Sequence, residues 1–315
     1  TIQDATGATS NVASVTLTVT PQNDPPMAVD DAAGVNEGGS VLIDLAGNDT
    51  DEDDALALGS IVITSAPSNG SLVNHGDGTF TYTHDGSETL GDSFSYTIQD
   101  ATGATSNVAS VTLTVTPQND PPVAVDDAAG VNEGGSVLID LAGNDSDPDN
   151  ALDLGSIVVT SGPANGSLAD HGDGTFTYTH DGSETLGDSF SYTIQDASGA
   201  TSNVASVTLT VAPQNDAPLI LDQFLSVTEN RPAGTLIGTV VATDPDLGDS
   251  LAYAIVSGNA SGTFAIDPAN GDLFVADPAG VDYESFPSYT LRVEVEDLAG
   301  VVREADVVVD VLDVN

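Results

Sequence analysis

The chain of 315 residues carries 49 Asp and Glu side chains but only three Lys and Arg, so its formal net charge is −46. Such a surface excludes the basic face that nucleic acids and anionic lipids require, and we expect neither as a partner. The sequence has no cysteine, which excludes disulfides and thiolate metal sites, and it has no run of about 18 apolar residues that would predict membrane insertion.

The sequence repeats itself at the length of a domain. The segment TIQDA begins at Thr1, Thr97 and Thr193, a period of 96, and residues 25–120 differ from residues 121–216 at 12 positions. Self-similarity over such a length indicates a tandem array, and 39% hydrophobic residues suffice for a core in each domain. Residues 1–23 match the last two strands of a preceding copy. Because they have no core of their own, we expect them to be ordered only by pairing with another sheet.

Short runs of alternating residues, bounded by turn residues, predict β-strands within each copy. In the second copy these runs cover residues 136–141, 156–161, 175–180, 188–195 and 204–211. Thr and Val alternate with period two in TFTYTH and VTLTV, which places one face on a core and the other in water. The HGDG segment is expected to form a hairpin turn. About seven strands in about 95 residues are typical of a sandwich. The predicted fold is therefore all-β, with tandem seven-stranded Greek-key β-sandwiches in a linear array.

Proline-flanked linkers separate the copies. PQNDPP occupies residues 21–26 and 117–122, and PQNDAP occupies residues 213–218. Proline fixes φ and removes a backbone donor, so these linkers are expected to be short, stiff joints. The predicted division is 1–23 for the end of a preceding repeat, 24–120 and 121–216 for two repeats, and 217–315 for a third domain.

Carboxylates recur at fixed positions beside the linkers, and no Lys or Arg precedes Arg231. Like charges without basic partners are screened by salt or held by bound cations. Calcium accepts roughly six to eight oxygen ligands in flexible geometry, so it suits such clusters far better than zinc. We therefore expect Ca²⁺ at the joints, with ordinary solvated turns as the alternative. The segment DTDED at 49–53 is similar to an EF-hand opening but lacks the later glycine and glutamate of that loop.

Residues 217–315 depart from the repeats and resemble a cadherin domain along their whole length. The matching pieces are SVTEN at 226–230, ATDPD at 242–246, LAYAI at 251–255, FAIDPANG at 264–271, VDYE at 281–284, VEVED at 293–297 and LDVN at 312–315. The resemblance implies calcium bound between successive domains. The implied ligands are Glu229, Asp282, Glu284, Asp313 and Asn315 at the C-terminal end, and Asp244, Asp246 and Asp297 on the side of the preceding repeat.

The two 96-residue copies resemble the cadherin-like repeats of giant RTX-type bacterial surface adhesins. A constant offset of 101 matches Asp196 with Asp297 and Asp181 with Asp282, whereas Ser183 falls where Glu284 stands and Glu184 lies next to it. The resemblance implies three sets of calcium ligands. They are Asn23, Asp24, Asp51, Asp53 and Asp100 at the N-terminal joint; Glu37, Asp85, Glu88, Asn119, Asp120, Asp147, Asp149 and Asp196 at the next; and Glu133, Asp181, Glu184, Asn215, Asp216, Asp244, Asp246 and Asp297 at the last.

The four histidines are two positions seen twice, His75 with His171 and His84 with His180. We expect them on the surface, in loops and at strand ends, because catalytic sites are rarely duplicated domain after domain. No nucleophile elbow, phosphate loop or zinc motif occurs, and no enzymatic activity is expected.

The expected function is that of an extender region in a large, secreted bacterial cell-surface adhesin, which serves cell adhesion and biofilm formation. Calcium would stiffen the joints between adjacent repeats of the chain. Two alternatives stay open. One is a module that binds polysaccharide, or identical chains by homophilic contact. The other is a subunit of an extracellular filament or sheath, joined to identical chains by β-strand exchange through residues 1–20.

Trypsin should leave residues 1–230 in one piece even after denaturation, because this stretch contains no Lys or Arg. Mass spectrometry of the digest measures the length of the resistant fragment. Cleavage by trypsin anywhere before Arg231 would contradict this expectation.

Overall fold

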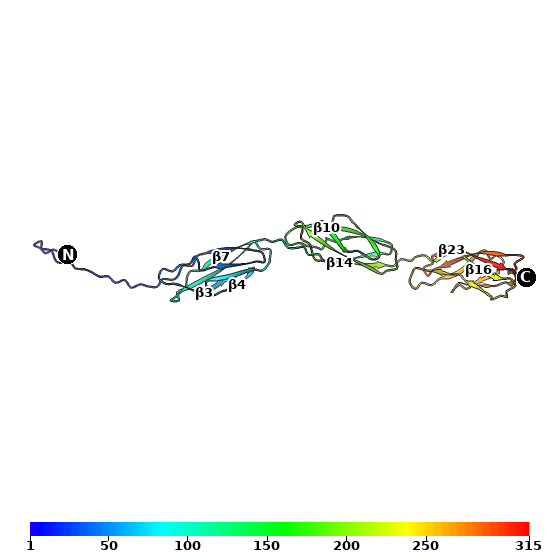
Figure 1. Cartoon of the computed structure of the whole chain (residues 1–315), viewed down its shortest axis with the longest axis horizontal. Coiled ribbons are helices and arrows are strands. Elements are labelled where there is room, and N and C mark those ends of the chain that lie inside the picture. Colours follow the sequence, from blue (N-terminus) through cyan, green and yellow to red (C-terminus); the bar gives the residue numbers. More distant parts are fainter. Residues whose placement is uncertain (315) are drawn as a thin grey trace. The chain divides into compact units, whose positions relative to one another are not determined.

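The structure is a computed structural model that describes residues 1–314. Its strands build three β-sandwiches, each around a hydrophobic core of its own (Figure 1). By compactness the chain divides into two units. One contains Thr1–Asp120 and Pro148–Asn150, and the other contains the remaining residues from Pro121 onward. The division of the sequence into four segments remains a prediction.

Seven strands form the first sandwich. They are β1 (Asp31–Asn36), β2 (Ser40–Asp44), β3 (Leu56–Ser65), β4 (Gly70–Asn74), β5 (Thr79–His84), β6 (Gly91–Asp100) and β7 (Ala109–Thr116). One sheet has the order β1-β7-β6-β3 and the other has the order β2-β5-β4. Along β7, buried and exposed residues alternate, with Val111, Leu113 and Val115 inside, as the period-two pattern requires. Leu45 and Tyr96 are fully buried in the same core.

The second sandwich repeats this arrangement. Its strands are β8 (Asp127–Asn132), β9 (Ser136–Asp140), β10 (Leu152–Ser161), β11 (Gly166–Asp170), β12 (Thr175–His180), β13 (Gly187–Asp196) and β14 (Ala205–Ala212). The sheets have the orders β10-β13-β14-β8 and β11-β12-β9. Every run predicted from the sequence contributes to a strand, and HGDG joins β11 to β12 as a hairpin. The prediction of an all-β sandwich is confirmed.

The segment DAAGVN, which forms β1 and β8, carries little strand signal in its sequence because alanine and glycine are poor strand formers. Each copy of the segment is nevertheless a strand, because it pairs in parallel with the last strand of its repeat, β7 or β14. Tertiary pairing decides the conformation here.

The third sandwich is built from shorter pieces. They are β15 (Leu219–Ile220), β16 (Gln223–Thr228), β17 (Leu236–Thr239), β18 (Ala242–Thr243), β19 (Ala252–Ser257), β20 (Phe264–Ile266), β21 (Asp272–Val275), a 3₁₀ turn η1 (Pro278–Gly280), β22 (Ser288–Glu296) and β23 (Val302–Leu312). The sheets are β16-β23-β22-β19, β17-β21-β20 and the pair β15-β18. As in the repeats, the first long strand, β16, pairs in parallel with the last, β23.

Residues 1–23 form no strand of the described structure, apart from an isolated bridge between Gln3 and Thr9. Their apolar side chains are exposed, for example Leu17 at 85%. The sequence VASVTLTV at 12–19 recurs at 108–115, where it forms most of β7. The same residues thus become a strand only where neighbouring strands satisfy their backbone groups.

The expectation of surface histidines is wrong for two of the four. His75 and His171 are exposed, but His84 and His180 are only 3% and 2% exposed. Both lie at strand ends, as expected. In TFTYTH the histidine stands two residues after the tyrosine and four after the phenylalanine, so it shares their core-facing side of the strand.

Leu141→Ala should destabilise the second repeat by about 2–5 kcal/mol, because Leu141 is 0% exposed and its truncation leaves a cavity. The matched control is Leu138→Ala, three residues earlier, where 64% exposure predicts a change within about 0.5 kcal/mol. Hydrogen–deuterium exchange of second-repeat peptides that include a position where the repeats differ, such as Ser146, measures both in the full chain at fixed calcium. Equal loss of protection from hydrogen exchange in the two variants would contradict the placement of Leu141 in the core and Leu138 on the surface.

Candidate metal sites

Parallel pairing of the first and last strands of a repeat carries an acidic side chain to the linker. In β1 and β7, Asn36 lies opposite Thr116, so both strands end at the same edge of the sheet. Glu37 follows directly, and its N–H donates to Thr116 O at 2.9 Å. Its Oε2 accepts a hydrogen bond from the N–H of Gln118 at 3.1 Å. The glutamate therefore lies against the linker.

Two more carboxylates meet Glu37 at this edge. Glu88, from the loop after β5, and Asp120, from the linker, each place an oxygen within 4.8 Å of an oxygen of Glu37 and of each other. A hydrogen bond with Asp149, loss of water and the nearby charge of Glu37 raise the pKa of Glu88 to about 7. Crowded carboxylates without a basic partner are what a bound cation stabilises.

The second repeat builds the same group. Glu133 follows β8, its N–H donates to Ala212 O at 2.9 Å, and its Oε2 accepts from the N–H of Gln214 at 3.1 Å. Glu184 and Asp216 complete the group within the same 4.8 Å. Loss of water and a hydrogen bond with Glu133 raise the pKa of Glu184 to about 7. Duplication of the sequence has therefore duplicated the site.

Several carboxylate oxygens in this arrangement are buried without a hydrogen-bond donor. Within residues 1–314 this holds for Glu37 Oε1, Asp51 Oδ2, Glu133 Oε1 and Asp244 Oδ2. A buried anionic oxygen without a donor is unfavourable unless a cation binds it. The four carboxylate groups of the described chain contain neither His nor Cys, and carboxylate oxygens are the ligands that Ca²⁺ prefers. The residues present therefore fit calcium.

The N-terminal end of the first repeat gathers a second set of acids. β3 begins opposite the end of β6, so the acidic loop before β3 lies beside Asp100. The linker binds this corner directly, because Asn23 Nδ2 donates to Asp100 Oδ2 at 2.8 Å and Asp24 N donates to Asp53 Oδ2 at 2.9 Å. The hydrogen bond from Asn23 and the N–H groups of the following turn lower the pKa of Asp100 to about 2. The carboxylate is therefore ionised at neutral pH.

The third domain repeats this corner at its own N-terminal end. Asn215 Nδ2 donates to Asp297 Oδ2 at 2.9 Å, and Asp216 N donates to Asp246 Oδ2 at 2.9 Å. The Asn-Asp pair of the linker thus contacts the same two acidic positions as in the first repeat.

Asp249 is a member of this corner that the sequence comparison missed. It forms a group with Asp244 and Asp297, whose carboxylate oxygens lie within 4.8 Å of one another. Burial and these neighbouring charges raise the pKa of Asp244. The signal was present in the sequence, because TDPDLGDSL and TDEDDAL both have an aspartate two residues before the leucine that leads into the next strand.

A fourth group lies at the C-terminal end of the third domain. Glu229, Asp282 and Glu284 place carboxylate oxygens within 4.8 Å of one another. Glu229 is 4% exposed and follows β16 as Glu37 follows β1, with its N–H donating to Leu312 O at 3.0 Å. Asp313 lies next to this strand end but is not a member of the group, and Asn315 lies outside the described residues.

Asp85 and Asp181 lie outside the carboxylate groups. The hydroxyl and N–H of Ser87 hold Asp85 in a turn, and Ser183 does the same for Asp181, which lowers the pKa of both carboxyls. The side chain that joins Glu37 is Glu88, three residues after Asp85. Both aspartates remain predicted ligands.

The other predicted ligands of the joint at residues 117–122 lie in that linker, in the acidic loop of the second repeat and at the end of β13. Asp149 Oδ2 accepts from Asp120 N at 2.6 Å, and Asn119 accepts a hydrogen bond from Asn150. Asp147, in the same loop, is half-buried. Asp196, at the end of β13, is 2% exposed, and its Oδ1 accepts from backbone N–H groups of the following turn.

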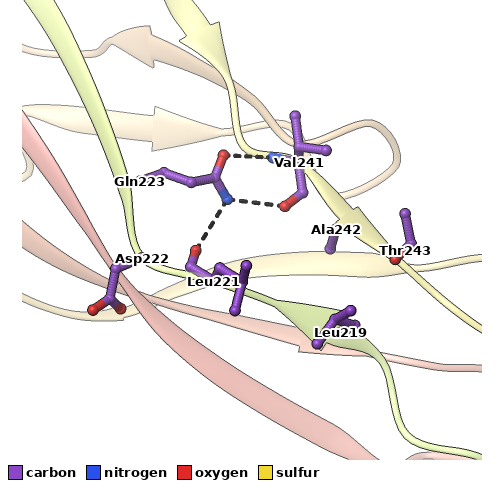
Figure 2. A pocket seen from close by; sticks show the side chains of 7 residues that line it. All are labelled: Leu219, Leu221, Asp222, Gln223, Val241, Ala242 and Thr243. Carbon is purple, nitrogen blue, oxygen red and sulfur yellow. Dashed lines mark hydrogen bonds between the residues drawn. The ribbon is translucent and has the colours of Figure 1, made fainter.

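A pocket of about 360 Å³ in the third domain has a different character (Figure 2). Three exposed apolar side chains, Leu219, Leu221 and Val241, line much of it. The side-chain amide of Gln223 spans it, donating to Val241 O and accepting from Val241 N, both at 2.9 Å. Its one carboxylate, Asp222, belongs to none of the four groups, so the acidic corners and not this pocket form the candidate site.

Comparison with known families agrees with this geometry. Residues 23–117 and 119–213 each match the bacterial cadherin-like domain, and residues 223–312 match the cadherin domain. The chain belongs to the cadherin families. The resemblances of the two repeats to bacterial cadherin-like domains and of the third domain to a cadherin domain are thereby confirmed. Cadherin-like domains are extracellular adhesion and structural domains.

Among curated cadherins, cadherin-24 of Mus musculus is 41% identical over 105 residues, which are 30% of this chain and 13% of that protein. The protocadherin-like wing polarity protein stan of Drosophila melanogaster is 35% identical over 114 residues, 35% of this chain and 3% of that protein. The chain thus spans a small part of the relatives it matches.

Among solved structures, the EC22-24 segment of mouse cadherin-23 is 22% identical with a TM-score of 0.60, covering 93% of this chain and 100% of that one. The protocadherin gammaB4 extracellular domain is 21% identical with a TM-score of 0.58, covering 93% and 50%. These likenesses establish the cadherin fold. No helix among residues 1–314 is long and apolar enough to cross a membrane.

Divalent cations should bind the first cadherin-like repeat less tightly as the pH falls through 7. Below a pKa of about 7 Glu88 holds a proton, which the cation must displace. From pH 7.5 to 5.5 a single such group weakens binding roughly 25-fold. Calorimetry in two buffers of different ionisation enthalpy measures the released proton.

Glu88→Gln should flatten this pH profile and abolish the proton release. Asp85→Asn is the matched control, because Ser87 keeps the pKa of Asp85 low and this carboxyl stays ionised over the range. A pH profile unchanged by Glu88→Gln would contradict the assignment.

Proposed function

We propose that this chain is a calcium-stiffened extender segment of a large bacterial cell-surface adhesin. The observation that carries the proposal is the carboxylate group at the C-terminal edge of each sandwich, which contains an oxygen without a donor in both repeats. Cadherin domains typically bind calcium, and the donor set of these groups is the one that calcium prefers.

The proposed calcium site at the linker 213–218 combines residues of the preceding repeat, the linker and the following domain. Glu133 and Glu184 come from the preceding repeat, and Asp216 comes from the linker itself. The linker also hydrogen-bonds Asp246 and Asp297 of the following domain. A cation that draws these carboxylates together would fix the direction in which one domain follows the next. The full ligand sets implied by the cadherin resemblance, and the boundaries at 24, 121 and 217, belong to this proposal.

The extracellular setting suits such sites. Ligand loops of extracellular modules commonly bind calcium in the range of roughly 10⁻⁴ to 10⁻³ M. Sites of this affinity would be empty in the cytosol, where the carboxylates repel one another, and filled outside the cell. The RTX-type adhesin and its role in biofilms are part of the proposal, as is a location on a bacterial surface. Strand exchange and polysaccharide binding have no specific observation in their favour within the described residues, and neither is proposed.

Small-angle X-ray scattering of the full chain should give a larger maximum dimension in millimolar calcium than in chelator. The distribution of chain dimensions should also be narrower, because bound cations restrict the motion of the linkers. The double variant Glu133→Gln/Asp216→Asn should lose part of this response, since it removes two of the three carboxylates in the group that includes Glu184.

The matched control for this experiment is Asp170→Asn/Asp173→Asn, which makes the same change of charge at exposed turns of the same repeat. It should respond to calcium like the unmodified chain. Scattering profiles of the unmodified chain that coincide with and without calcium would refute the proposed function.

A further inference from the structure

His84 lies at the end of β5 and contacts two loops at once. Its Nδ1 accepts hydrogen bonds from Gly38 N and from Gly86 N, both at 3.3 Å. Because Nδ1 accepts, the ring hydrogen is on Nε2, which donates to Thr89 Oγ1 at 2.9 Å. The backbone N–H of His84 also donates to Gly39 O at 2.9 Å. A single buried side chain therefore joins the turn after β1 to the loop after β5.

These contacts flank the carboxylates of the first group. Gly38 directly follows Glu37, and Thr89 directly follows Glu88. The turn that carries Glu37 contains two consecutive glycines, the first at a φ of 61°, and the N–H of Gly39 donates to Asn36 O at 2.9 Å across it. The imidazole adds hydrogen bonds that join this turn to the loop of Glu88 from inside the sandwich.

The second repeat contains the same arrangement. His180 Nδ1 accepts from Gly134 N and Gly182 N, both at 3.2 Å, and Nε2 lies 2.9 Å from Thr185 Oγ1. The neighbouring carboxylates are Glu133 and Glu184, which form the second group.

The third domain achieves the same local conformation without histidine. The residue after Glu229 is Asn230, at a φ of 59°, and its N–H donates to the carbonyl oxygen of Val281 at 3.0 Å. A backbone carbonyl there accepts the hydrogen bond that an imidazole nitrogen accepts in the repeats. The repeats therefore depend on a side chain for a contact that the third domain makes with its backbone.

We propose that His84 and His180 are positioning residues of the metal sites, which hold the loops of Glu37 and Glu88, and of Glu133 and Glu184, at the separation a cation requires. This inference rests on the proposed binding of calcium. The histidines contact backbone N–H groups and a threonine hydroxyl beside the ligands and are not ligands themselves. Groups that orient metal ligands from behind typically change metal affinity by roughly 10–100-fold when they are removed.

The test compares three substitutions of His84 in the full chain. Asparagine places its side-chain oxygen near the position of Nδ1, glutamine places its amide near Nε2, and alanine fills neither position. We expect calcium affinity at the first group to fall roughly 10–100-fold in His84→Ala. It should fall similarly in His84→Gln and recover most of the loss in His84→Asn. Calcium-dependent hydrogen–deuterium exchange reports this site separately when the peptides extend from Glu37 to Met27 or Thr50, and from Glu88 to Asn74 or Thr102, because the two repeats differ at these positions.

The chain provides its own controls. The peptides around Glu133 and Glu229 should keep their calcium response in every His84 variant. His75→Ala, in the same repeat, removes an exposed histidine whose ring hydrogen-bonds Thr81 Oγ1, and it should have no effect. Hydrogen–deuterium exchange without calcium shows whether β5 stays folded in each variant. If His84→Ala unfolds the repeat, the calcium affinities of His84→Asn and His84→Gln decide whether His84 positions the site.

Equal affinities of the asparagine and glutamine variants, or an alanine variant that is folded and binds calcium normally, would overturn the positioning role while leaving the proposed function intact. An unmodified chain whose peptides show no calcium response would overturn the proposed function itself.

Discussion

The parallel pairing of the first and last strands of each sandwich is the constraint on which the rest of the structure depends. Because β1 and β7 run in the same direction, the residue after β1 and the start of the linker meet at one edge. The pairings of β8 with β14 and of β16 with β23 do the same. A glutamate follows the first of these strands each time, so all three sandwiches present a carboxylate where the chain leaves them. An antiparallel pairing would have separated the two by the length of a strand.

The linker at residues 213–218 is held by protein contacts on both sides before any cation binds. Gln214 donates its N–H to Glu133, and the two residues that follow donate to Asp297 and Asp246. These hydrogen bonds remove much of the freedom that a short proline-flanked segment still has. A cation entering such a site has little chain entropy to offset, which is the general advantage of preorganised sites.

The strands and the positions of most candidate ligands could be predicted from the sequence, because alternation, turn residues and a nearly exact repeat can be read directly from it. What could not be predicted depends on contacts across the fold. Glu88, and not Asp85, joins the group of Glu37, because the N–H of Ser87 donates to the carboxylate of Asp85 and holds it in a turn. The burial of His84 follows from its side of β5, and its hydrogen bonds to two loops appear only when the sandwich is assembled. Residues 12–19 show that a sequence alone does not decide whether a segment is a strand. They form no strand, although the identical segment at 108–115 forms most of β7.

The six residue pairs that join β1 to β7 also decide how a repeat responds to tension. A pull on the two ends of a repeat draws β1 toward its N-terminus and β7 toward its C-terminus. The two strands are therefore loaded in shear, and the hydrogen bonds between them share the load instead of opening one after another. Resistance to forced unfolding is set by the rate at which a repeat crosses its unfolding barrier. The same topology that brings a glutamate to each linker thus makes each repeat resistant to unfolding when its two ends are pulled apart.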